Sequence, residues 1–256
     1  MDGEHLQLLA AGTGGSARTI AVRSLSGRGP TVLWCGGFMS EMAGTKASHL
    51  AEWAAGAGRA YVRFDYSGHG ESEGRFEDGT ISRWAEEARA VFDACCPGET
   101  VVVGSSMGGW IALLLARSLL ATPGRLKGLV LIAPAADFTE ALMWQQMPPE
   151  GQRAVLEEGV WQAPTDYGEM PYTITRGLIE DGRTNLILGD VVRTGCPVRI
   201  LQGMADPDVP WQHTMRLVER LAQDDATLTL IKDGDHRLSR PEDLDLIVRA
   251  IADLSG

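Results

Sequence analysis

The chain has 256 residues, enough for one domain with a large buried core, and its formal net charge of −11 opposes binding to nucleic acid or anionic lipid. Hydrophobic residues make up 44 % and charged residues 22 %, which is ordinary for a soluble globular protein. No apolar run approaches the roughly 18 residues of a membrane span, and the segment Met1–His5 lacks the basic region of a signal peptide. We therefore expect a cytoplasmic protein with no nucleic-acid partner and no membrane span.

The first half of the chain predicts a β-hairpin followed by alternating strands and helices. Apolar segments at residues 6–10 and 18–23 flank a glycine-rich turn and form the hairpin. Continuous apolar strands separated by helices predict a parallel sheet that is covered on both faces. Strands are expected at 31–35, 60–64, 100–103 and 126–133, and helices at 45–57, 80–96 and 110–117.

The alternation stops between residues 137 and 193. This segment is rich in Met, Trp and Pro, and it includes Trp144, Met147 and Met170. We expect it to be an inserted cap, whose apolar side chains either face a substrate or form only the cap's own core. The sequence thus predicts a single α/β domain, residues 1–256, with a cap at roughly 137–193. Strands at 197–203 and 226–231 and helices at 211–222 and 241–254 complete the predicted sheet.

A Gly-x-Ser-x-Gly motif, Gly104–Gly108, lies between the strand at 100–103 and the helical segment that includes Trp110. The pattern alone is weak, because a chain with 31 glycines contains such spacings by chance. Its position between a strand and a helix strengthens it. A sharp turn there exposes a serine hydroxyl, and the positions two residues away on either side must lack side chains. Ser106 is therefore the candidate nucleophile, and the backbone N–H of Met107 is a candidate oxyanion donor.

Candidate partners of Ser106 follow two later strands. Asp206 comes after the strand at 197–203, and His236 lies in the turn after the strand at 226–231. A serine hydroxyl needs a base to take its proton, and the base needs an acid to fix its tautomer. The chain order Ser, Asp, His is the one expected of an α/β-hydrolase.

Other acids and histidines in the sequence are alternatives for the same roles. Asp208 and Asp137 are the alternative orienting acids, and Asp206 is favoured because it comes directly off a strand end. Asp208 is expected to face solvent or to cap the next helix. The remaining histidines are interpreted as solvated or packing residues: His5, His49, His69 and His213.

The rest of the site is predicted from the loops near these residues. The pair Gly36-Gly37 allows a close backbone approach, so the Phe38 N–H is the second candidate oxyanion donor; a simple strand-ending turn is the alternative. Met39, Trp144 and Met204 are candidate substrate-binding residues, which predicts an apolar, deformable pocket.

No cofactor and no metal are expected. The sequence contains no phosphate-cradling glycine loop, no dinucleotide fingerprint and no cluster of ligands with metal spacing. The four cysteines, Cys35, Cys95, Cys96 and Cys196, form no evident disulfide framework, which is typical of a reducing compartment.

Several longer strings of residues resemble one branch of the α/β-hydrolase superfamily, the branch with mitochondrial palmitoyl-protein thioesterase and acyl-glucuronide esterase activity. The resemblance implies the α/β-hydrolase fold, esterase or thioesterase activity, and a triad of Ser106 as nucleophile, Asp206 as acid and His236 as base. It agrees with the independent interpretation of the motifs. The strings lie at residues 37–46, 63–68, 103–110, 203–206, 209–211 and 235–237.

We therefore expect a serine hydrolase that cleaves carboxylic esters or thioesters of apolar acyl groups through an acyl-enzyme on Ser106. Its partner would be a small-molecule ester or thioester, or an acylated protein. A carbon–carbon bond hydrolase or an acyltransferase could use the same triad. A non-catalytic, hydrolase-like binding receptor is the alternative from another class, and the presence of all three triad residues argues against it.

Overall fold

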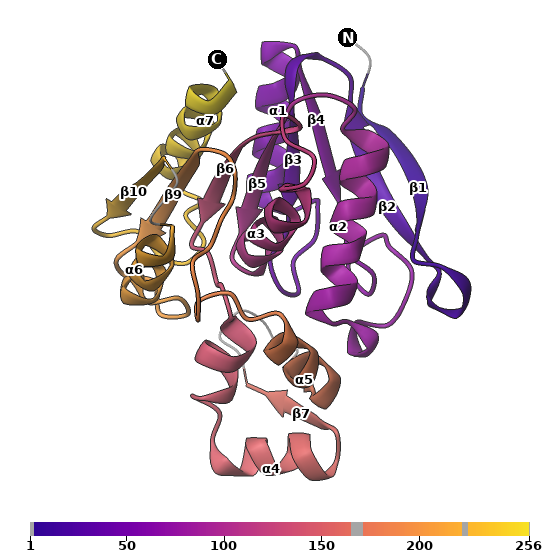
Figure 1. Cartoon of the computed structure of the whole chain (residues 1–256), viewed down its shortest axis with the longest axis vertical. Coiled ribbons are helices and arrows are strands. Elements are labelled where there is room, and N and C mark those ends of the chain that lie inside the picture. The colour runs from indigo at the N-terminus through magenta and orange to yellow at the C-terminus, as the bar shows by residue number, and fades with distance from the viewer. Residues whose placement is uncertain (1–2, 165–170, 222–224, 256) are drawn as a thin grey trace.

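A central eight-stranded sheet organises the computed structural model, which describes residues 3–164, 171–221 and 225–255 (Figure 1). The strand order is β1-β2-β4-β3-β5-β6-β9-β10; β2 is antiparallel to both β1 and β4, and the other neighbouring pairs are parallel. The mostly parallel α/β-hydrolase sheet predicted from the sequence is confirmed. The strands are β1 (His5–Ala11), β2 (Arg18–Leu25), β3 (Arg28–Cys35), β4 (Arg59–Phe64), β5 (Thr100–Ser105), β6 (Leu126–Ile132), β9 (Val198–Gly203) and β10 (Ala226–Ile231).

Helices cover both faces of this sheet (Figure 1). Along β5, Val101 and Val103 pack into the core beneath α1 and α7, while Val102 packs into the core beneath α2, α3 and α6. Successive side chains of a strand point to opposite faces, so a strand buried on both sides has an unbroken apolar sequence. The helices are α1 (Thr45–Ala57), α2 (Ile81–Cys95), α3 (Met107–Leu119), α6 (Trp211–Arg220) and α7 (Pro241–Ser255).

The segment between β6 and β9 projects beyond the end of the sheet (Figure 1). It has a small apolar core of its own, made by Met147, Val155, Ala163, Ile174 and Ile179. We call residues 138–188 the inserted segment. Its elements are the π-helical turn η3 (Thr139–Trp144), α4 (Pro149–Glu157), β7 (Val160–Ala163), β8 (Tyr172–Thr175) and α5 (Arg176–Thr184).

Asp137 holds the two ends of the inserted segment together. Its carboxylate accepts hydrogen bonds from the N–H groups of Ile187 (2.8 Å) and Leu188 (2.9 Å), about fifty residues further along the chain. Burial raises the pKa of this carboxyl group, and the two N–H donors oppose that shift. The division into one domain with a cap at 137–193 stays a prediction. Residues 165–170, with the predicted cap residue Met170, and Ala222 at the predicted end of a helix lie outside the described residues.

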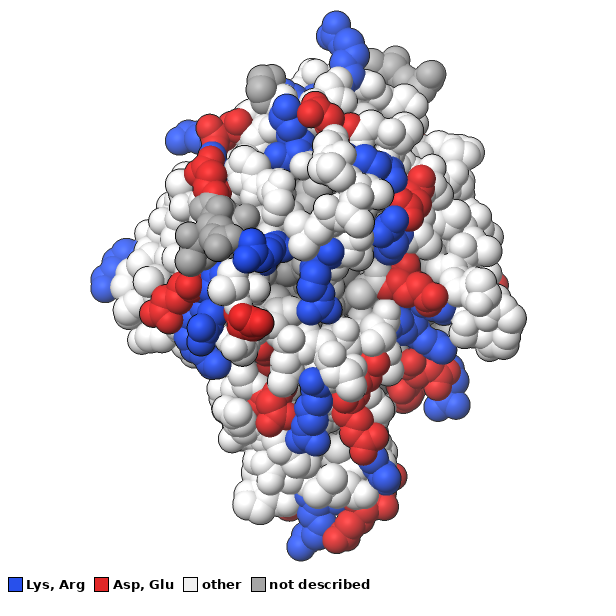
Figure 2. All heavy atoms as spheres, in the orientation of Figure 1, with Lys and Arg blue, Asp and Glu red and all other residues white. Residues whose placement is uncertain are grey.

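Acidic and basic side chains are interspersed over the face shown in Figure 2, which carries no large patch of one sign. Side chains of opposite charge form local ion pairs, as Arg125 does with Asp93 (2.8 Å). Among the described residues, no helix combines the length and apolar character that a membrane span requires.

Candidate active site

Ser106 lies at the tip of a strained turn between β5 and α3. Its backbone has φ 55° and ψ −119°, a conformation that residues other than glycine rarely adopt. The turn leaves no space beside it: a Cβ atom on Gly108 would lie 2.1 Å from the carbonyl oxygen of Cys35, and one on Gly104 would lie 2.3 Å from that of Gly108. Both glycines of the motif are therefore required by close backbone approach, as the sequence pattern predicts.

His236 lies between Ser106 and Asp206. Its Nε2 atom is 3.1 Å from the Ser106 Oγ atom, and its Nδ1 atom is 2.8 Å from the Asp206 Oδ2 atom. A carboxylate can only accept, so Nδ1–H donates to Asp206 and Nε2 is left to accept the serine proton. The structure thus brings together three residues that are up to 130 positions apart in the chain.

Four hydrogen bonds fix the Asp206 carboxylate, whose side chain is fully buried. Oδ1 accepts from the N–H groups of Asp208 and Val209, both at 2.9 Å. Oδ2 accepts from His236 and from the side-chain amide of Gln202 (3.2 Å). The role of the buried Gln202 on β9 was not identified from the sequence, because the sequence shows only one polar residue within a strand.

The Nδ1 atom of His236 is hydrogen-bonded to Asp206 rather than to either of the two alternative acids. Asp208 is exposed, and its backbone rather than its carboxylate supports Asp206. Asp137 uses both carboxylate oxygens to hold Ile187 and Leu188.

Gly203 lets the loops that carry the acid and the base approach each other. A Cβ atom at this position would lie 2.3 Å from the carbonyl oxygen of Gly234 and 2.6 Å from that of Asp235. Because Gly203 ends β9 and Gly234 lies in the turn after β10, this contact joins the two strand ends directly. The hydrogen bond between Asp206 and His236 depends on that proximity.

The loop after β3 passes beside Ser106. A Cβ atom on Gly37 would be 3.4 Å from the Cβ atom of Ser106, so the backbone here comes close to the candidate nucleophile. Phe38 follows in this loop, and Met107 is the first residue of α3, where a backbone N–H has no partner inside the helix. The two candidate oxyanion donors therefore belong to the two segments that flank Ser106.

His69 anchors this loop, a role that the sequence did not indicate. Its Nε2 atom accepts from the N–H of Met39 (3.2 Å), and its Nδ1 atom donates to the carbonyl oxygen of Ser67 (3.2 Å). Burial lowers the pKa of His69, which keeps Nε2 available as an acceptor. Asp65 supports the next part of the loop by accepting from the N–H of Met42 (2.6 Å).

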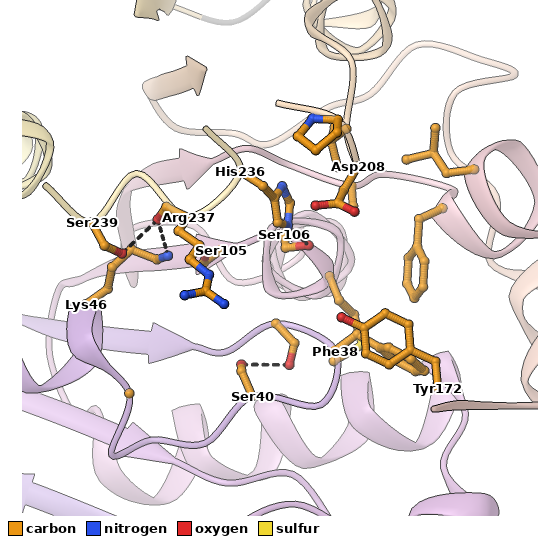
Figure 3. A pocket seen from close by; sticks show the side chains of 18 of the residues that line it. Phe38, Ser40, Lys46, Ser105, Ser106, Tyr172, Asp208, His236, Arg237 and Ser239 are labelled. Atoms are coloured by element: carbon orange, nitrogen blue, oxygen red, sulfur yellow. Dashed lines mark hydrogen bonds between the residues drawn. The ribbon is translucent and has the colours of Figure 1, made fainter. Parts of the chain in front are cut away.

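Ser106 and His236 open into a cavity of about 560 Å³ (Figure 3). One side of the cavity, which we call the acyl arm, is apolar and joins the loop after β3 to the inserted segment. Within it the Phe38 ring meets the rings of Phe138 and Tyr172, with centroids 5.7 and 5.8 Å apart. The acyl arm is formed by Phe38, Phe138, Leu142, Met143, Tyr172 and Ile174.

The three predicted substrate-binding residues are not among the side chains that line this cavity. Met39 has φ 54° and is 39 % exposed. Trp144 packs against the core of the inserted segment, with the guanidinium of Arg183 4.8 Å from its ring centroid. Met204 lies in the turn after β9 and is bound there through its N–H to Ile231. The apolar character of the pocket was predicted from the sequence; the direction of individual side chains was not.

Asp206, Asp208 and His236 also place possible metal-ligand atoms within 4.8 Å of one another. Both oxygens of Asp206 and the Nδ1 atom of His236 are already engaged in hydrogen bonds to each other and to neighbouring groups. This donor set fits a histidine–acid pair better than a resident metal.

Comparison with known proteins identifies the family. Residues 31–247 match the model of the alpha/beta hydrolase family. The chain belongs to this family. A solved structure from Agrobacterium vitis S4 is 47 % identical, with a TM-score of 0.96 and full coverage of both chains. The mouse alpha/beta hydrolase domain-containing protein 10 is 31 % identical, with a TM-score of 0.85 over 98 % of each chain.

The human mitochondrial palmitoyl-protein thioesterase ABHD10 is 35 % identical over 236 residues, which cover 92 % of this chain and 76 % of that protein. The resemblance noted from the sequence motifs is thereby confirmed. This α/β-hydrolase thus has thioesterase relatives. The prediction of a cytoplasmic location is wrong by the same comparison, because the curated relatives are named as mitochondrial proteins.

Proposed function

We propose that the protein is a serine hydrolase of carboxylic esters or thioesters that carry an apolar acyl group. One observation carries the proposal: His236 lies 3.1 Å from Ser106 and 2.8 Å from Asp206, and Ser106 and His236 line a cavity with an apolar side. The relatives named as palmitoyl-protein thioesterases support an acyl substrate, delivered either by a small molecule or by an acylated protein.

Each residue has a defined role in the proposed reaction. The Oγ atom of Ser106 attacks the acyl carbon while Nε2 of His236 takes the hydroxyl proton, and Asp206 stabilises the resulting imidazolium. The N–H groups of Phe38 and Met107 would bind the developing oxyanion, and each such donor is worth about 3 kcal/mol of transition-state stabilisation.

The tetrahedral intermediate formed by this attack then collapses to an acyl-enzyme, which water hydrolyses in a second stage. The bond from the acyl carbon to the leaving oxygen or sulfur breaks, and the leaving atom takes the proton from His236. Water next attacks the acyl-serine while His236 takes a proton from it; His236 then returns this proton to the Oγ atom of Ser106 as the acyl–Oγ bond breaks and the acid is released. The apolar acyl arm suits a hydrocarbon chain, because moving such a chain out of water is favourable by about 25 cal/mol per Å².

A fluorophosphonate probe tests the proposal. We expect labelling of the wild-type protein at Ser106 by mass spectrometry, together with turnover of p-nitrophenyl octanoate. Ser106→Ala should lose both. Ser26→Ala, an exposed position at the opposite edge of the sheet, should keep both. Absence of labelling would favour a non-catalytic binding protein, and turnover that survives Ser106→Ala would refute the mechanism.

A further inference from the structure

Glu87 is a fully buried carboxylate that the proposed reaction does not use. It lies on α2, is 0 % exposed, and is not among the residues that line the cavity beside Ser106. Burying a carboxylate is costly unless charged and hydrogen-bonding partners surround it. Arg18 on β2 supplies the opposite charge through its Nε atom, and Ser67 supplies two further hydrogen bonds. Three donors thus fix this carboxylate in one orientation.

The bonds from Glu87 to Ser67 continue to His69. Oε2 of Glu87 accepts from the N–H of Ser67 (2.9 Å), and Oε1 accepts from its hydroxyl group (2.6 Å). With its N–H and its side chain both fixed, Ser67 directs its carbonyl oxygen at Nδ1 of His69 (3.2 Å). A carbonyl oxygen can only accept, so Nδ1 carries the proton and Nε2 is the acceptor for the N–H of Met39.

The loop between β3 and α1, residues 36–44, is therefore tied to α2 through buried groups, and we call it the oxyanion loop. Its candidate oxyanion donor, the N–H of Phe38, lies one residue before the N–H that His69 binds. The Phe38 ring packs against Phe76 and Trp84, with centroids 5.0 and 6.1 Å apart. The His69 ring packs against the same two rings, at 5.2 and 5.3 Å. A shift of His69 would therefore move the backbone that carries the Phe38 N–H.

The neighbouring carboxylate, Glu86, differs from Glu87 in a way that separates two roles. Its side chain is 56 % exposed, and it pairs with the Nη2 atom of Arg18 at 2.8 Å. Glu86 thus shares the ion pair between β2 and α2, whereas Glu87 also accepts both hydrogen bonds from Ser67.

We propose that Glu87 is a positioning residue for the proposed reaction and acts through Ser67 and His69 on the oxyanion loop. The carboxylate fixes Ser67, Ser67 fixes the tautomer and ring of His69, and His69 fixes the backbone beside the Phe38 N–H. The proposal rests on the proposed hydrolase function and adds no bond-making step to it. It gives a buried ion pair outside the cavity an effect on binding of the transition state.

Replacing the carbonyl oxygen of the substrate by sulfur tests the oxyanion loop directly. p-Nitrophenyl octanoate and its thionoester, in which C=S replaces C=O, share the same hydrocarbon chain and leaving group. Sulfur is a weak hydrogen-bond acceptor, so correctly placed N–H donors favour the oxygen ester in the transition state. The ratio of kcat/KM for the ester to kcat/KM for the thionoester therefore reports the placement of the donors.

Glu87→Gln should lower this ratio by about tenfold. The amide presents an N–H where the carboxylate accepted a hydrogen bond, so Ser67 or Arg18 must shift. A displaced oxyanion donor should cost less than the hundredfold or more that follows from its removal. Glu86→Gln removes the same charge from the same helix and the same ion pair, and it should keep the wild-type ratio. The ratio cancels losses that affect both substrates equally, such as incomplete folding.

A double variant tests whether Glu87 acts through His69. His69→Ala already releases the N–H of Met39, so adding Glu87→Gln to it should lower the ratio no further. Residues that act independently would instead give losses that multiply.

The possible failures are distinct. A wild-type ratio in Glu87→Gln, an equal fall in Glu86→Gln, or losses that multiply in the double variant would overturn this proposal and leave the hydrolase function standing. Absence of ester turnover by the wild-type protein would instead refute the proposed function.

Discussion

The carboxyl edge of the central sheet and the inserted segment contribute to the same cavity in different ways. At the sheet edge, polar side chains are fixed by directional bonds, as the four hydrogen bonds to Asp206 illustrate. The inserted segment contributes apolar side chains: Tyr172 packs against the small core of that segment, and Leu142 packs against the core beneath α2, α3 and α6. The proposed function therefore assigns bond making to the first region and recognition of the acyl chain to the second. Substitutions should separate these two tasks.

The largest effect on activity is expected from substitution of Asp206 at the carboxyl edge of the sheet. Asp206→Asn should lower kcat for p-nitrophenyl octanoate by about 10⁴-fold, because an amide cannot hold His236 in the tautomer that accepts the serine proton. Asp208→Asn should lower kcat by less than about tenfold, since the Asp208 carboxylate is not the one bound to His236. Equal losses in the two variants would contradict the assignment.

A smaller loss is expected at the loop beside the nucleophile. His69→Ala removes the acceptor for the Met39 N–H and should reduce kcat by about tenfold to a hundredfold, with little change in KM, since misplaced oxyanion donors weaken transition-state binding. His69→Gln can present an acceptor oxygen and should recover part of the loss. If His69 served only packing, both variants would lower the melting temperature without this difference in kcat.

Substitution in the inserted segment should instead change chain-length preference. Leu142→Ala should reduce kcat/KM for an octanoyl ester by about tenfold, the effect of losing roughly 1.5 kcal/mol of apolar contact, and should affect an acetyl ester less than about twofold. Leu156→Ala, at a position on α4 that is 54 % exposed, is the matched control. Equal losses on short and long esters would assign Leu142 to the reaction rather than to acyl recognition.

The difference between the two regions also explains which features could be predicted from the sequence. The elbow around Ser106 follows from local rules, since two glycines and a strand-to-helix transition are visible in a few consecutive residues. Asp206 and His236 follow strand ends, and parallel strands bring their carboxyl ends to one edge of the sheet. The expected strands and helices outside the inserted segment agree with the structure to within a few residues.

The cavity lining depends on directions that no local pattern contains. Trp144 and Leu142 are both apolar residues of the π-helical turn η3, yet Leu142 lines the cavity and Trp144 packs away from it. His69 has the sequence character of a packing residue, and only its contact with Met39 reveals a second role.

The sequence by itself determined the α/β architecture, the sharp turn at Ser106 and the three polar residues at strand ends. Backbone propensity and hydrophobic alternation can be recognised within short stretches of chain. The tertiary structure alone decided that Gln202 donates a hydrogen bond to Asp206, that the inserted segment supplies Leu142 and Tyr172 to the cavity, and that Lys46 donates to the carbonyl oxygen of Arg237 beside it. These relations join segments far apart in the chain, and the packing of the whole fold sets the direction of each side chain.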